Sequence, residues 1–259
     1  MAERRRVGSE PALIPVADAR AARAACEEVY ANRPRWVTRR LNGKPPMHTL
    51  GRAAYLDLDP ARPERHADYF ADAGEQARWA GPAVRELTAG VRAALAEHLH
   101  APVDVAAGLP APGFHVFVGA AIPRTDCVAR ASDCASSHFD LQYRRIDWER
   151  RYAEVDLSET ISFTLPLRLP AAGGGLTVWE ALTLERMRDA LAAGRFADLA
   201  SAAHAVPGED VRYAVGTLVV HGGHVLHQIA GVPRASVLDE RITLQGHGVF
   251  ADGAWRVYW

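Results

Sequence analysis

A histidine and an aspartate stand two residues apart in the segment 136–143, Ser-Ser-His-Phe-Asp-Leu-Gln-Tyr. The segment reads as a β-strand, in which successive side chains point to opposite faces. His138 and Asp140 then share one face, where an imidazole and a carboxylate form half of a metal-binding surface. An isolated His-x-Asp pair also fits an exposed polar strand face, and both interpretations stay open on this segment alone.

Three further histidines stand at three-residue intervals: His221, His224 and His227. This spacing is that of a helix, but a β-branched run precedes the histidines and Gly222-Gly223 interrupts them. Both features favour a tight turn between two strands. On the second strand His227 lies between apolar neighbours of the same face, which is usual for a hydrogen-bonded core histidine. His115, in an earlier apolar run, has the same ordinary interpretation.

A guanidinium and a hydroxyl share a face in the segment 241–248, Arg-Ile-Thr-Leu-Gln-Gly-His-Gly, read as a strand. Arg241 can give a carboxylate two parallel charge-assisted hydrogen bonds, and Thr243 can add a third. Arg234 is a weaker candidate because it follows a proline in a loop, and a loop positions a carboxylate clamp less firmly than a strand. The alternative for Arg241 is a surface arginine on an exposed edge strand.

Short strands separated by glycine and proline dominate the chain from Pro112 onward. The run 161–169 alternates between apolar and polar side chains, which indicates a strand with one buried face. Residues 182–204 interrupt the strands with an amphipathic helical stretch, and such insertions often form lids or packing faces. Many short strands in series favour a sandwich or barrel. The expected strands cover residues 113–118, 136–143, 161–169, 176–180, 211–215, 217–221, 225–230, 241–250 and 255–258.

Helical patterns, with one short extended piece, dominate the chain before this β-rich region. We therefore expect an α+β fold in which an N-terminal helical segment, 1–110, packs on a β-rich core, 111–259. The N-terminal segment does not need to fold alone. The expected helices cover residues 17–31, 63–79 and 82–100, and the extended piece covers 53–58.

The composition is that of an ordinary soluble globular protein. Hydrophobic residues make up 49% and charged residues 24% of the chain, and the formal net charge is −1. No global field therefore favours nucleic acid or a membrane surface, and no apolar run approaches the ~20 residues of a membrane span. The three cysteines, Cys26, Cys127 and Cys134, are odd in number and scattered, which predicts free thiols in a cytoplasmic protein.

In their order along the predicted strands, these motifs together resemble the signature of the Fe(II)- and 2-oxoglutarate-dependent oxygenases. The resemblance spans residues 112–250 and includes the Gly-rich turn that precedes Trp179. It implies a double-stranded β-helix, a jelly-roll or cupin-like fold, for the core. The residues that carry it are His138-x-Asp140, His227 and Arg241-x-Thr243.

The resemblance also implies roles for these residues. His138, Asp140 and His227 would bind one face of an Fe(II) ion and leave three positions open. 2-Oxoglutarate would take two of these positions and dioxygen the third, while Arg241 and Thr243 would hold the distal carboxylate of 2-oxoglutarate. The implied reaction is hydroxylation of a substrate C–H bond with release of succinate and carbon dioxide. Asp140 argues against halogenation, because the related halogenases have a small residue at this position.

Two other functions stay open. A zinc hydrolase would use the same three ligands, since imidazole and carboxylate also suit zinc, but zinc gives no reason for the Arg-x-Thr pair. A non-catalytic cupin-like binding protein would use the histidines for packing. Within the oxygenase interpretation, His221 and His224 compete with His227 as the distal ligand, and Arg234 competes with Arg241.

The substrate is indicated only by class, because a fold does not choose among substrates. A small molecule, or a residue bound to a peptide or carrier, is expected. Nucleic acid is not, since no basic patch with interleaved aromatic residues is present. The sequence carries no signal for an oligomeric state. Candidates for the wall of the substrate pocket are Trp179, Gln142, Tyr143 and the loop around Arg124.

Overall fold

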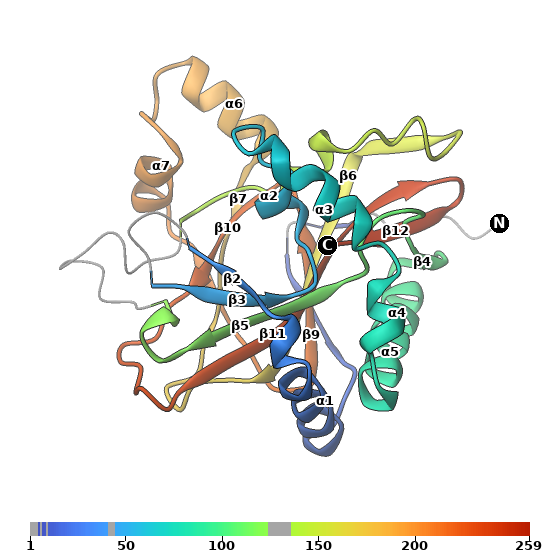
Figure 1. The fold of residues 1–259 in the computed structure, drawn as a ribbon. Coiled ribbons are helices and arrows are strands. Elements are labelled where there is room, and N and C mark those ends of the chain that lie inside the picture. The colour runs from blue at the N-terminus through green and yellow to red at the C-terminus, as the bar shows by residue number, and fades with distance from the viewer. Residues whose placement is uncertain (1–4, 6, 9, 41–44, 124–135) are drawn as a thin grey trace.

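The β-structure consists of two largely antiparallel sheets, of nine and three strands (Figure 1). The computed structural model describes residues 5, 7–8, 10–40, 45–123 and 136–259. The strands are β1 Ala12–Pro15, β2 Val37–Arg39, β3 Met47–Leu50, β4 Val103–Val105, β5 Gly113–Val118, β6 Val155–Arg168, β7 Gly175–Thr183, β8 Glu209–Arg212, β9 Thr217–Gly222, β10 Val225–Ala230, β11 Glu240–Ala251 and β12 Ala254–Tyr258. The larger sheet has the order β1-β9-β6-β11-β5-β3-β2, with β12 pairing β11 and β4, and the smaller sheet has the order β10-β7-β8.

The helices lie mostly outside the sheets (Figure 1). Their bounds are α1 Ala19–Ala31, α2 Ala54–Asp57, α3 His66–Ala71, α4 Glu75–Trp79, α5 Pro82–Leu99, α6 Leu184–Ala192 and α7 Leu199–Ala205, and the described 3₁₀-helices are η1 Arg33–Arg35, η2 Pro63–Arg65, η3 Gly119–Ala121 and η5 Gln142–Arg145. Asp18 caps α1 by accepting a hydrogen bond from the Ala21 amide at 2.8 Å. None of the described helices is long and apolar enough to cross a membrane.

The centre of the larger sheet separates an apolar core from the candidate site. On β6, Ile161, Leu165 and Leu167 pack in the main core with the buried faces of α1 and α5. The intervening Ser162 and Thr164 point the other way and line a cavity. The alternation predicted for 161–169 is therefore confirmed from Ile161 to Leu167, and Ser162 and Thr164 of its polar side face the site. Leu169 lies beyond the end of β6 and packs in a separate apolar cluster.

The N-terminal part of the chain contributes strands as well as helices. β1 pairs with β9, and β3 pairs with β5, so the larger sheet includes segments from both ends of the sequence. These strands were not predicted, because three or four residues are too few to show an alternating pattern.

Gly216 is the point at which the N-terminal segment meets β9. Its carbonyl accepts hydrogen bonds from the amides of Val16 and Ala17 at 2.9 and 3.0 Å. Its φ of +81° is left-handed, and a Cβ at this position would stand 1.8 Å from the Ala17 carbonyl oxygen. Only glycine allows this close approach of two backbones.

Two extended segments predicted from the sequence are wrong. Residues 53–58 contain α2, because the carboxylate of Asp57 turns back to accept a hydrogen bond from the Ala53 amide at 2.9 Å. Residues 136–143 form no strand: His138 makes one isolated β-bridge to His227, and η5 begins at Gln142. The expected helix over 63–79 is broken into η2, α3 and α4.

The helical insertion expected over 182–204 is confirmed as α6 and α7, which stand apart from α1 and α5 in Figure 1. Their apolar residues pack with Trp179 and Leu226 of the smaller sheet. Cys26 is buried with a free thiol, and Cys127 and Cys134 lie outside the described residues.

Candidate active site

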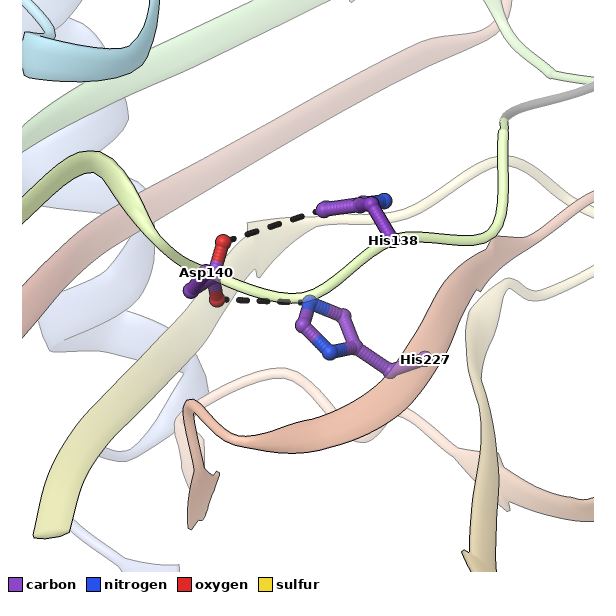
Figure 2. A group of neighbouring side chains, drawn as sticks. All are labelled: His138, Asp140 and His227. Atoms are coloured by element: carbon purple, nitrogen blue, oxygen red, sulfur yellow. Dashed lines mark ion pairs between the residues drawn. The ribbon is translucent and has the colours of Figure 1, made fainter. Parts of the chain in front are cut away.

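Three predicted metal ligands meet at one place, although one of them is far from the others in the sequence. Ligand atoms of His138, Asp140 and His227 all lie within 4.8 Å of one another. The Asp140 carboxylate faces both imidazoles, with Oδ2 3.3 Å from Nε2 of His227 and Oδ1 3.9 Å from Nε2 of His138 (Figure 2). Two imidazoles and one carboxylate suit Fe(II) with open coordination positions, and they also suit zinc.

Backbone hydrogen bonds hold the segment of His138 and Asp140 against β10. His138 and His227 exchange two bonds, of 2.9 and 3.1 Å, and the Asp140 amide donates to the Gly223 carbonyl at 2.9 Å. Gly223 is also tightly enclosed, since a Cβ there would lie 2.5 Å from Oγ1 of Thr160. The glycine pair predicted as a turn thus brings two distant segments together.

The two imidazoles are oriented in the same way. Nδ1 of His138 lies 2.8 Å from the Ser136 carbonyl, and Nδ1 of His227 lies 2.9 Å from the Val225 carbonyl. Because a carbonyl oxygen only accepts, each Nδ1 carries the proton, and each neutral ring has its Nε2 free to bind a metal.

A hydrogen-bonded chain fixes the carboxylate of Asp140. Ser162 donates to Oδ2 of Asp140 at 2.6 Å, so the Ser162 oxygen accepts from Nδ1 of His247 at 3.2 Å. Burial alone would raise the pKa of Asp140, but the adjacent His227 and His247 outweigh burial and hold this pKa well below its usual range. These hydrogen-bonded residues contact Oδ2 of Asp140, so Oδ1 is the carboxylate oxygen available to bind a metal.

His227 and Asp140 shift each other's pKa. Burial by itself would lower the pKa of His227, but the Asp140 carboxylate raises it above its ordinary value. A proton and a metal ion therefore compete for the same Nε2, as expected at a metal site.

Arg241 and Thr243 form a second polar group within the larger sheet. Arg241 is 1% exposed, and its guanidinium lies 5.5 Å from the ring centroids of both Phe117 and Tyr213. Among the described residues, none of its side-chain nitrogens has a hydrogen-bond partner, and the same is true of the Thr243 hydroxyl. Burial lowers the pKa of Arg241, and a buried, unpaired cation is costly. The group has the chemistry of an anion-binding site.

A cavity of about 320 Å³ lies between the two sheets beside the triad. Phe117 and Tyr213, whose rings lie against the Arg241 guanidinium, form part of its wall, whereas Arg241 and Thr243 themselves do not line it. Of the residues expected to line a substrate pocket, Gln142 does so. Trp179 and Tyr143 pack in separate apolar clusters, and Arg124 lies outside the described residues.

The rival candidates lie elsewhere or make other contacts. His224 sits in the turn after β9, where its Nε2 is 2.9 Å from the Tyr143 hydroxyl. His221 packs its ring 4.5 Å from that of His227, with Nδ1 3.1 Å from the Gly222 carbonyl. Arg234 is exposed. The geometry therefore groups His227 with His138 and Asp140.

Ser162 and His247 are the site residues that sequence reasoning did not identify. The signal for Ser162 was its place on the polar side of a predicted strand, and that for His247 was its place on the face of Arg241. Their meeting depends on the pairing of β6 with β11, in which His247 stands opposite Ser162. Sequence periodicity does not contain that register.

Solved structures share this fold at low sequence identity. One is an N-substituted L-amino acid dioxygenase from Burkholderia ambifaria AMMD in complex with alpha-KG (TM-score 0.52, 13% identity, covering 96% of this chain and 86% of that chain). Another is the non-heme alpha ketoglutarate dependent epimerase SnoN from nogalamycin biosynthesis (TM-score 0.50, 15% identity, 97% and 81%). No protein-family model and no curated protein sequence matches the chain. The predicted double-stranded β-helix fold is thereby confirmed.

Proposed function

We propose that this protein is an Fe(II)- and 2-oxoglutarate-dependent oxygenase that hydroxylates a C–H bond of a small molecule or of a peptide- or carrier-bound residue. The observation that carries the proposal is a His-Asp-His triad on the wall of a cavity, together with a buried guanidinium that lies against Phe117 and Tyr213 of the same wall and has no hydrogen-bond partner among the described residues. The structural neighbours support it, since one of them was crystallised with alpha-KG.

His138, Asp140 and His227 would hold the metal through two Nε2 atoms and one carboxylate oxygen. When bound there, Fe(II) would supply dioxygen activation, in which 2-oxoglutarate gives two electrons by decarboxylation and the substrate C–H bond gives two, one oxygen atom entering succinate and the other the substrate. The balanced reaction is R–H + O₂ + 2-oxoglutarate → R–OH + succinate + CO₂. Ser162 keeps Asp140 oriented, and the carbonyls of Ser136 and Val225 keep both imidazoles in the metal-binding tautomer.

Arg241 would bind the distal carboxylate of 2-oxoglutarate, with Thr243 as a further donor. A carboxylate that pairs with the guanidinium offsets the cost of burying the cation. The aromatic rings of Phe117 and Tyr213 exclude water from the pair and so strengthen it. A zinc hydrolase with the same ligands would have no use for this group.

Succinate formation tests the proposal. Metal-depleted protein is supplied with Fe(II), 2-oxoglutarate and air, and succinate is measured with and without a metabolite library. Wild-type protein is expected to form succinate, and Asp140→Ala and His227→Gln to form none above background. His204→Gln, an exposed substitution on α7, is the matched control and retains the activity. Absence of succinate from wild-type protein that retains tight zinc would overturn the proposal in favour of a hydrolase.

A further inference from the structure

Two polar side chains of η5 line the cavity beside the triad. η5 starts two residues after Asp140, and Gln142 and Arg145 stand at its two ends. A 3₁₀-helix has three residues per turn, so residues i and i+3 lie on one face. Both side chains belong to the cavity wall, and their role is not explained by binding of the metal or of 2-oxoglutarate.

Gln142 is buried and lacks a partner for its amide nitrogen. The residue is 4% exposed, and Nε2 has no hydrogen-bond partner among the described residues. A buried amide donor without an acceptor is costly. Because Gln142 lines the cavity, a ligand there can provide the acceptor.

Arg145 supplies a positive charge at the same wall. It is the one arginine or lysine among the described residues that line the cavity. It is exposed, and its Nη1 donates one long hydrogen bond, of 3.3 Å, to the Tyr55 carbonyl. A guanidinium has five N–H donors, so several are available to a ligand. Arg144 differs, because its Nε donates to the Tyr143 hydroxyl at 3.2 Å and it does not line the cavity.

Much of the remaining cavity wall is apolar. Met47 and Ile122 belong to an apolar cluster that also includes Phe117, and all three line the cavity. A ligand that satisfies both regions has one anionic end and an apolar body. A single guanidinium balances one negative charge, which matches a carboxylate better than a phosphate dianion.

We propose that the substrate is a small free carboxylic acid, whose carboxylate binds Arg145 and Gln142 while its apolar part lies against Met47 and Ile122. This inference rests on the proposed oxygenase function, and it selects among the substrates left open there. An apolar residue that is linked to a carrier through its carboxyl group, or that lies inside a peptide, has no free carboxylate and does not satisfy the pair.

Binding of matched acids and amides tests the inference. The full-length protein is saturated with Fe(II) and 2-oxoglutarate without oxygen, so that Arg241 is already occupied. Thermal shift then gives dissociation constants for the proteinogenic amino acids and short unbranched carboxylic acids, each against its primary amide. At least one acid is expected to bind about tenfold or more tightly than its amide, as a charge-assisted hydrogen bond allows.

Variants identify the groups responsible. Arg145→Ala is expected to weaken binding of that acid about tenfold and to remove the preference for acid over amide. Arg145→Lys should restore part of the preference, and Gln142→Ala should weaken acid binding by a smaller factor. Arg144→Ala is the control and should bind as wild type does.

Three results would overturn the inference: no acid binds, each amide binds as well as its acid, or Arg144→Ala and Arg145→Ala have equal effects. Failure of the oxygenase function is recognised separately. In that case wild-type protein forms no succinate from 2-oxoglutarate under air, whereas a wrong inference leaves succinate formation intact.

Discussion

Arg241 is the residue whose surroundings are least compatible with a protein that binds no anion. It is buried against two aromatic rings, and its guanidinium has no hydrogen-bond partner among the described residues. If Arg241 served stability alone, its buried charge would be expected to form an ion pair with a carboxylate of the protein. The guanidinium instead lies against two aromatic side chains of the cavity that the triad also lines, and this common wall connects the two halves of the proposed site.

Replacing this guanidinium should separate ligand binding from stability. In Arg241→Met an apolar chain of similar length replaces an unpaired buried charge, so the melting temperature without 2-oxoglutarate should equal or exceed that of wild type. 2-Oxoglutarate at 100 times its dissociation constant should stabilise wild type by about 2.7 kcal/mol and should not stabilise the variant. Thermal unfolding measures both effects, with the exposed Arg234→Met as control. A wild-type response of Arg241→Met to 2-oxoglutarate would exclude the assigned role.

Ser162 should tune the metal ligand that it touches. Ser162→Ala removes the 2.6 Å hydrogen bond to Asp140, so the carboxylate loses its fixed orientation. Loss of such a supporting contact typically weakens metal affinity about 10- to 100-fold, which competition with a chelator measures. Ser158→Ala is the control, since Ser158 is an exposed residue of β6 that contacts Asp156. Equal affinities of Ser162→Ala and wild type would show that the contact is incidental.

The sequence alone was enough to predict those site residues that lie close together within one segment. His138 with Asp140, and Arg241 with Thr243, are two residues apart, so a local pattern contains each pair. The choice of His227 over His221 needed the resemblance, because all three histidines of that run are near one another. Ser162 and His247 come together only through strand register.

At the scale of elements, long or strongly patterned segments were predictable and short ones were not. β10 was predicted with its observed bounds, and α5 and β11 to within one residue at their ends. The segment 136–143 alternates like a strand, yet it meets one residue of β10 and one residue of a turn, so no ladder continues past Asp140. The local sequence pattern cannot show that no strand pairs with this segment beyond Asp140.

The junction between the N-terminal segment and β9 gives a prediction at this scale. Gly216→Ala places a methyl group against the Ala17 carbonyl and forces a left-handed alanine, which itself costs about 1–2 kcal/mol. The variant should lose clearly more stability than this in urea unfolding. Gly194→Ala is the matched control, because Gly194 is also left-handed, at φ +67°, but nothing lies within 4 Å of its added Cβ. Equal losses of unfolding free energy in the two variants would mean that the close contact at Gly216 adds nothing to the cost of a left-handed alanine.

The whole molecule encloses its site between two sheets, and this burial extends to histidines beyond the metal ligands. Burial, followed by the positive charges of Arg241 and Arg39, lowers the pKa of His115 to about 3. His115 lies on β5 opposite Thr243 of β11, and its Nε2 is 2.7 Å from the Tyr55 hydroxyl. The fold therefore keeps this ring, which belongs to the cavity wall, neutral.

The depressed pKa of His115 predicts how stability depends on pH. Between pH 6.5 and 3 the unfolded chain binds a proton at this histidine and the folded chain does not, so the free energy of unfolding falls as pH falls. The contribution is up to about 1.4 kcal/mol per pH unit. His115→Gln should flatten the wild-type slope by this amount in urea unfolding at pH 6.5 and pH 5. His204→Gln, which changes an exposed histidine, should keep the slope, and an unchanged slope in His115→Gln would refute the prediction.

In the proposed enzyme, one ferrous ion and one 2-oxoglutarate bind together at His138, Asp140 and His227. An anaerobic titration of metal-depleted protein with Fe(II) and then 2-oxoglutarate tests it most directly. We predict a weak visible charge-transfer band that saturates at one 2-oxoglutarate per chain and is absent from Asp140→Ala. Absence of the band from wild-type protein, together with tight binding of zinc, would contradict the account.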